Sequence, residues 1–181
     1  CGSVLPLMAM PATPPAGGVG GAACAMHPVA ESAPVSPWII YCDGSAMPNP
    51  GRMGLGVVLC APDGTCHTLA QATHTTGCNN EAELRALHAA LLLAGLAGAR
   101  RLLLRGDSSV AIGQVTGRER TIVARLLPLI ANAQSALGGF EEVQLLWVPR
   151  HRNRDADRLA RQALGLVPKP ASAPSSRSRQ R

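Results

Sequence analysis

The amino-acid sequence predicts an α/β domain with a mixed five-stranded sheet and helices on both faces. Short apolar runs bounded by Gly, Pro and Asn alternate with longer segments of helical periodicity, which is the pattern of such a fold. The first three predicted strands follow one another through short connections, which favours antiparallel pairing. Each later strand is reached through a helix, and right-handed crossovers place the strands near Leu102 and Leu145 parallel to the first.

The first part of the domain is predicted to form three strands. A strand is expected at 38–43, followed by a loop at 44–51. Two further strands at 54–61 and 65–73 flank the turn residues Pro62-Asp63-Gly64, which predicts a hairpin. These three strands form the antiparallel part of the expected sheet.

The rest of the domain is predicted to alternate helices with single strands. A helix is expected at 80–97, because apolar residues recur there at helical spacing between a start signal at Asn80 and closing glycines. Pro128 is expected to kink a later helix. The remaining predicted elements are a strand at 101–105, a short helix at 108–115, the kinked helix at 121–137, a strand at 143–148 and a final helix at 155–164.

Composition bounds the domain organisation. The 181 residues are enough for one core domain, predicted at 37–166, with a tail at each end. Residues 1–36 are rich in Ala, Gly and Pro and show no structural period, and residues 167–181 form a basic segment, so both are expected to be disordered. Only four residues are aromatic, so we expect Leu, Val, Ile and Ala to build the core.

The charge and hydropathy of the chain limit its partners. The formal net charge is +6, which is consistent with a polyanionic partner. Sixteen of the seventeen basic residues are Arg, which suits phosphate binding, although a GC-rich genome produces the same bias. No apolar stretch approaches the roughly 20 residues that a membrane span needs. A cytoplasmic protein without membrane contact or an obligate protein partner is therefore expected.

Six cysteines show no spacing typical of a zinc site. Cys60 and Cys66 flank the predicted hairpin turn and could face each other across it. Because the protein is expected in the cytosol, where thiols stay reduced, we favour free thiols.

Two acidic residues follow predicted parallel strands directly. Asp43 ends the apolar run at 38–42, and Asp107 ends the run at 102–106. Taken singly, Asp43-Gly44 suits a turn and Asp107-Ser108 suits a helix N-cap. The carboxyl ends of parallel strands meet at one edge of a sheet, so the two carboxylates are expected to be neighbours. Neighbouring carboxylates repel each other, and hard divalent cations would offset that repulsion.

A glutamate is expected to join the two aspartates. Glu83 lies on the apolar stripe of the predicted helix at 80–97, so its side chain should face the sheet. The alternative is a capping box, with Asn80 as N-cap and Glu83 at the third helical position. Glu81 is expected on the solvent side, in an ion pair with Arg85.

Taken together, the motifs resemble those of type 1 ribonuclease H over about residues 38–166. The resemblance rests on Asp43-Gly44-Ser45, Asn49-Pro50-Gly51, Asn79-Asn80 with Glu83-Leu84, Asp107-Ser108, and Val148-Pro149-Arg150-His151 with Asn153, Asp157, Leu159 and Ala160. It implies a ribonuclease H-like fold and a metal-dependent endonuclease that cleaves the RNA strand of RNA–DNA hybrids. The alternatives are a nucleic-acid-binding module with weak or no catalysis, and a nuclease acting on another nucleic acid.

The resemblance also implies the site residues. Two Mg²⁺ ions, with Mn²⁺ as an alternative, would be held by the catalytic acids Asp43, Glu83, Asp107 and Asp157, and the Asp-x-Leu-Ala ending selects Asp157 over Asp155. His151 matches a catalytic histidine that carries a proton or helps product leave. Positions matching the family's substrate-binding residues are Gly44, Ser45, Asn49, Asn79, Asn80, Ser108 and Ser109.

Three features depart from the family pattern. The basic protrusion that many bacterial members insert is missing, since Val115 leads almost directly to Thr121. His151 lies only six residues before Asp157, and Cys78 replaces a hydroxyl residue that helps to hold a phosphate. Phosphate contacts are therefore expected from loop arginines, namely Arg52, Arg150, Arg152 and Arg154.

Overall fold

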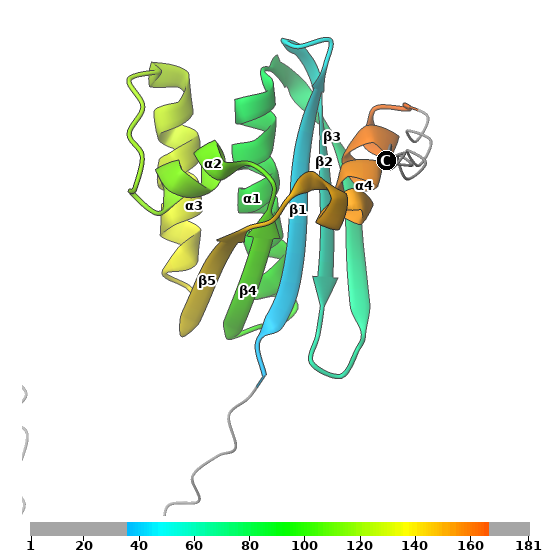
Figure 1. The fold of residues 1–181 in the computed structure, drawn as a ribbon, viewed down its shortest axis with the longest axis vertical. Coiled ribbons are helices and arrows are strands. Elements are labelled where there is room, and N and C mark those ends of the chain that lie inside the picture. Colours follow the sequence, from blue (N-terminus) through cyan, green and yellow to red (C-terminus); the bar gives the residue numbers. More distant parts are fainter. Residues whose placement is uncertain (1–35, 167–181) are drawn as a thin grey trace, which may run out of the picture. The chain divides into compact units, whose positions relative to one another are not determined.

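The structure is a computed structural model that describes residues 36–166 (Figure 1). The disorder predicted for the two tails concerns residues outside this range, except Ser36. Five strands form one sheet in the order β3-β2-β1-β4-β5. The elements are β1 (Trp38–Met47), β2 (Gly51–Cys60), β3 (Cys66–Gly77), α1 (Asn79–Leu96), β4 (Arg101–Gly106), α2 (Ser109–Val115), the 3₁₀ turn η1 (Ala124–Leu126), α3 (Leu127–Leu137), β5 (Glu142–Trp147), the 3₁₀ turn η2 (Arg150–Arg152) and α4 (Arg154–Ala163).

The pairing of the strands confirms the predicted mixed sheet. β1 pairs antiparallel with β2, and β2 pairs antiparallel with β3. β1 pairs parallel with β4, which pairs parallel with β5. β1 is therefore the strand at which the two halves of the sheet meet.

Helices cover both faces of the sheet, as predicted. A Cβ placed on Gly44 would lie 2.1 Å from the carbonyl carbon of Ala82 in α1, and one on Gly56 would lie 2.1 Å from the carbonyl oxygen of Ala156 in α4. Gly56 is paired with Asp43, the neighbour of Gly44, so the two glycines point to opposite faces. Figure 1 shows α4 apart from the other three helices. Glycine at both positions lets a helix approach the sheet without a side chain between them.

The main core lies between the sheet and α1. It is aliphatic, as predicted, and contains Ile40, Leu84, Leu87 and Leu104 among its fully buried side chains. The helix contributes small residues at regular intervals, with Ala82, Ala86, Ala90 and Ala94 all inaccessible to solvent. Because alanine is small, α1 can lie close to the strands, and this positions the first turn of the helix beside β1.

The first predicted strand is too short. β1 continues through Asp43 to Met47, and β2 begins at Gly51, so most of the expected loop at 44–51 belongs to the sheet. The reason is that β1 has two neighbours of different length. Its pairing with β4 ends at Cys42 opposite Gly106, whereas its pairing with β2 continues to Met47 opposite Arg52. Asp43 thus follows the last parallel pair although it lies within the strand.

The prediction of a kink at Pro128 is wrong. α3 begins at Leu127 after the 3₁₀ turn η1, so the proline occupies the first turn of the helix. Proline is tolerated there because the first amide groups of a helix have no intrahelical acceptor.

The predicted start of α1 is also wrong in detail. Cys78, not Asn80, is the N-cap residue, and Glu81 rather than Glu83 closes the cap. The Glu81 Oε2 atom accepts a hydrogen bond of 2.8 Å from the Cys78 amide and lies 3.3 Å from Arg125 Nε. The expected ion pair of Glu81 with Arg85 does not form, because the cap turns the carboxylate toward η1.

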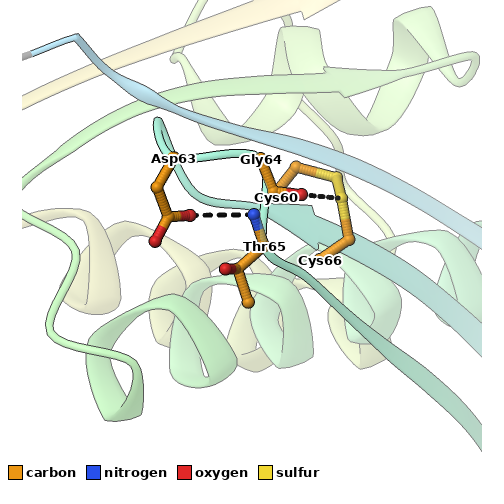
Figure 2. The surroundings of a disulfide bond; sticks show 5 residues. All are labelled: Cys60, Asp63, Gly64, Thr65 and Cys66. Atoms are coloured by element: carbon orange, nitrogen blue, oxygen red, sulfur yellow. Dashed lines mark hydrogen bonds between the residues drawn. A yellow bond between two sulfur atoms is a disulfide. The ribbon is translucent and has the colours of Figure 1, made fainter.

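The expectation of free thiols is wrong at the hairpin of β2 and β3. Cys60 and Cys66 form a disulfide across the turn between β2 and β3 (Figure 2). The two residues are partners in the strand register, which brings their side chains to the same face. Within the turn, the Asp63 carboxylate accepts a hydrogen bond of 2.8 Å from the Thr65 amide.

Membrane insertion through a helix is not supported over residues 36–166, where none of the helices combines the length and the apolar character of a membrane span.

Replacing Gly44 by Ala should destabilise the domain. The added methyl group would meet the backbone of α1, which cannot move without separating the helix from the sheet, so we expect a loss of about 1–3 kcal/mol in the free energy of unfolding. The control is Gly95→Ala, at an exposed α1 position with open space around it, which should gain up to about 1 kcal/mol. Urea unfolding measures both. Equal effects would contradict the close approach at Gly44.

Candidate metal-binding active site

Three carboxylates converge at the edge where the parallel strands end. Asp43, Glu83 and Asp107 each offer one oxygen, and these oxygens lie within 4.8 Å of one another. Cys42 of β1 is paired with Gly106, the last residue of β4, so the residues that follow this pair, Asp43 and Asp107, lie side by side. The prediction that Asp43 and Asp107 are neighbours is confirmed.

Glu83 reaches this cluster because α1 crosses β1 at Gly44. Its Oε2 atom lies 3.3 Å from the Gly44 amide nitrogen, which donates a hydrogen bond to it. A larger residue at position 44 would push the first turn of α1 away and remove this contact. The structure therefore supports the interpretation that Glu83 faces the sheet and not its own helix end.

Asn153 holds Asp107 in place. It is only 1% exposed, and its Nδ2 group donates to the backbone oxygen of Cys42 at 2.9 Å and to Asp107 Oδ1 at 3.0 Å. Asn153 is the residue before α4, and its side chain makes no cap hydrogen bond to that helix. It links β1, the end of β4 and the start of α4, so it fixes the geometry of the acids.

Asp157 lies at the edge of the cluster and is paired with Arg150. The Arg150 Nη2 atom is 2.5 Å from Asp157 Oδ1, and its Nε atom is 4.0 Å from Asp107 Oδ2. Asp157 is not among the three acids whose oxygens lie within 4.8 Å, although its charge is close enough to act on Asp43. Arg150 thus places a positive charge beside two of the four predicted acids.

The cluster is electrostatically unfavourable as it stands. Burial, together with repulsion from Asp107 and Asp157, raises the pKa of Asp43 from 3.8 to about 8. Burial and repulsion from Asp43 and Asp107 likewise raise the pKa of Glu83 well above its usual range. The Oδ2 atom of Asp43 is buried and has no hydrogen-bond partner. A cation would satisfy that oxygen, and three carboxylates form a donor set suited to a hard divalent ion.

The other predicted site residues surround the acids or lie apart from them. The Asn79 Oδ1 atom accepts from the Ala46 amide at 2.9 Å, and Asn49 Oδ1 accepts from the Asn79 amide at 3.1 Å, so these side chains join the β1–β2 turn to α1. Ser108 Oγ accepts from Ala111 N at 3.2 Å and caps α2. Ser45 is partly buried, and Asn80 and Ser109 are exposed.

His151 is not brought to the acids. It lies exposed in η2, and within residues 36–166 no hydrogen bond or ion pair joins it to a carboxylate. The neighbouring residue Arg150 makes that contact instead. Sequence reasoning missed this role of Arg150 and that of Asn153. The four-residue spacing from Asn153 to Asp157, one helical turn, was the available signal.

Comparisons with known proteins identify a matching family and several relatives of this chain. The family described as "Reverse transcriptase-like" matches residues 41–163. The bifunctional protein Rv2228c of Mycobacterium tuberculosis is 36% identical over 137 residues, which are 75% of this chain and 37% of that protein. Ribonuclease HI of Halobacterium salinarum is 38% identical over 124 residues, which are 68% of this chain and 62% of that protein.

Solved structures agree with these matches. The crystal structure of the Halobacterium salinarum RNase H1 superposes with a TM-score of 0.69 at 35% identity, covering 72% of this chain and 98% of that one. LC11-RNase H1, crystallised in complex with an RNA/DNA hybrid, has a TM-score of 0.65 at 28% identity, covering 71% and 96%. The chain spans less than two thirds of the length of the two sequence relatives.

The stability of the protein without metal should fall as pH rises. The unfolded Asp43 carboxyl ionises near pH 4, whereas in the folded protein it keeps its proton up to about pH 8. The folded state therefore binds more protons over this interval, and the free energy of unfolding should decrease from about pH 4 to about pH 8 and then level off. Asp43→Asn should reduce this decrease. Urea unfolding at several pH values measures it, and an unchanged slope in the variant would contradict the account.

Removing the charge of Arg150 should destabilise the protein without metal. Arg150→Gln takes a cation away from Asp107 and Asp157, and because the pair is largely exposed we expect a loss of up to about 1 kcal/mol. Added Mg²⁺ should restore part of that loss, because the ion supplies the missing positive charge. The matched control is Arg152→Gln, an exposed residue of the same 3₁₀ turn. Thermal unfolding measures both variants. Equal losses of stability would show that Arg150 does not stabilise the protein through Asp107 and Asp157.

Proposed function

This chain belongs to the reverse transcriptase-like family and has a ribonuclease H-like domain, and we propose that it hydrolyses the RNA strand of RNA–DNA hybrids. The observation that carries the proposal is the convergence of Asp43, Glu83 and Asp107 at the end of the parallel strands. Such a cluster destabilises the folded protein when no cation is bound. Its presence therefore favours an activity that uses a bound cation.

Two relatives support the choice of substrate. The Halobacterium salinarum protein is named ribonuclease HI, and LC11-RNase H1 was crystallised with an RNA/DNA hybrid. The superpositions cover 98% and 96% of the two solved chains and 72% and 71% of this chain. The same fold can serve other nucleic acids, so the hybrid is the proposed substrate and its cleavage has to be measured.

The metal requirement follows from the acids. Asp43, Glu83 and Asp107 would hold a divalent ion, and Asp157 would complete a second position. We propose two Mg²⁺ ions, with Mn²⁺ as an alternative. When bound, such ions make a water molecule nucleophilic and stabilise the negative charge on the leaving oxygen.

The chain itself would hold these acids in place and neutralise charge. Asn153 keeps Asp107 oriented, and the Gly44 amide holds Glu83. Arg150 is 65% exposed while it contacts Asp157, so its guanidinium is within reach of an approaching phosphodiester. We propose that it neutralises phosphate charge next to the acids. His151 lies on the same turn and is proposed to carry a proton to or from solvent after cleavage.

The surroundings of the acids suit a nucleic acid that lies across the start of α1. Asn80 and Ser109 are exposed at the starts of α1 and α2, and offer hydrogen-bonding groups to sugars or base edges. Asn49, in the β1–β2 turn, is hydrogen-bonded to Asn79 at the start of α1, and Ser45 lies nearby in β1. Contact with a 2′-hydroxyl is how such a surface distinguishes an RNA strand from DNA.

A cleavage assay tests the function directly. Purified protein is incubated with end-labelled RNA in a hybrid, in an RNA duplex and as a single strand, with Mg²⁺ and with a chelator. Internal cuts of the RNA in the hybrid, only with metal, are expected. Cleavage of the RNA duplex in preference would indicate a different nuclease. Binding of hybrid without any cleavage would indicate a binding module.

The two glutamates of α1 should separate catalysis from folding. Glu83→Gln removes a charged oxygen from the cluster and should lower the rate of hybrid cleavage by several orders of magnitude while the fold persists. Glu81→Gln is the matched control on the same helix turn. It weakens the cap of α1 and the ion pair with Arg125, so it should cost roughly 1 kcal/mol of stability and leave the rate nearly unchanged. Similar rates for the two variants would exclude Glu83 from the metal site.

A further inference from the structure

A pocket with a mixed apolar and polar lining lies on α1, away from the acid cluster. It has a volume of about 360 Å³ and is lined by residues of β3, α1 and α3, with smaller contributions from β2. This size is at the lower end of small-molecule sites. Its polar lining consists of Arg85, His88, His74, Gln71, Asn132 and the threonines of β3. No acidic residue lines it, so the pocket presents hydrogen-bond donors and a positive charge without a carboxylate.

Arg85 is the unusual member of this pocket. Its Nε atom is buried and has no hydrogen-bond partner, and within residues 36–166 its guanidinium forms no ion pair. Glu81, the acid expected to pair with it, is held instead by the Cys78 amide and Arg125. A partly buried guanidinium without an acceptor is unfavourable, because its lost hydration is not replaced. An anion in the pocket would offer an acceptor to the N–H groups of Arg85 that line it.

The pocket is separate from the proposed active site. Arg85 follows Glu83 by two residues, which places it about 200° further around the helix, so the two side chains leave α1 in nearly opposite directions. His88 follows Arg85 by three residues and lies on the same side of the helix as Arg85. Burial lowers the pKa of His88, which favours a neutral imidazole with one N–H donor.

We propose that this pocket binds a phosphate group, through the Arg85 guanidinium with N–H and O–H donors from His88 and β3. Arginine presents several donors in a planar fork, which matches the oxygens of phosphate. The phosphate could belong to a free small molecule or to the backbone of a bound nucleic acid. The chemistry of recognition is the same for both sources.

Titration with inorganic phosphate tests the proposal without any metal or nucleic acid. Isothermal titration calorimetry should show binding to the wild-type chain, and Arg85→Gln should weaken it by about tenfold or more, because a charged hydrogen bond is lost. Arg120→Gln, at an exposed position outside the pocket, is the control with the same change of charge. Absence of phosphate binding to the wild type, or equal binding to the two variants, would overturn the proposal.

A readout on the unmodified chain covers the case in which Arg85→Gln does not fold. The Arg85 side-chain N–H resonance of the wild-type protein should shift with added phosphate, together with ring signals of His88. Shifts confined to other arginines would overturn the proposal.

A second arm distinguishes the two sources of phosphate. Hybrid binding is measured in Ca²⁺ at several salt concentrations for the wild type, Arg85→Gln and Arg120→Gln. A backbone phosphate in the pocket predicts that only Arg85→Gln flattens the plot of log affinity against log salt, by about one unit. A free phosphate ligand predicts an unchanged slope with phosphate binding still lost. This arm alone rests on the proposed function, so failure of the hybrid assay leaves the inorganic phosphate result intact.

Discussion

Mutual repulsion among Asp43, Glu83 and Asp107 is the constraint on which the rest of this structure depends. Three carboxylates with oxygens within 4.8 Å of one another are unfavourable at neutral pH unless a proton or a cation lies among them, and the Oδ2 atom of Asp43 is also buried without a partner. The rise in the pKa of Asp43 and Glu83 expresses that cost. The fold must therefore hold the acids together despite their mutual repulsion. Binding of a divalent ion would relieve that repulsion, and this relief would contribute to the affinity for the metal.

The contacts that hold the acids together come from separate parts of the chain. Parallel pairing of β1 with β4 brings Asp43 and Asp107 side by side. The close approach of α1 at Gly44 delivers Glu83, and that of α4 at Gly56 delivers the helix that carries Asp157. Asn153 then joins β1 and Asp107 to the start of α4. Arg150 offsets part of the negative charge from the solvent side. Because these contacts join distant parts of the sequence, the site forms only when the whole sheet has folded.

The sequence predicted the parts of the site that follow from strand order and helical periodicity. The two aspartates were placed together because parallel strands share one edge, and Glu83 because it lies on the apolar stripe of α1. The contacts of Asn153 and Arg150 depend on how the segment after β5 folds back, which the four-residue spacing from Asn153 to Asp157 does not specify. The cap of α1 was missed because cysteine is not a usual N-cap residue, and the disulfide because the redox argument concerned the compartment and not the register of the hairpin.

Anomalous diffraction from crystals grown with Mn²⁺ tests the central claim most directly. The claim is that these acids are held together for a divalent cation. It predicts an anomalous peak bounded by oxygens of Asp43, Glu83 and Asp107, lost in crystals of Asp43→Asn. Order at the three acids without a peak between them, or an equal peak in the variant, would contradict it.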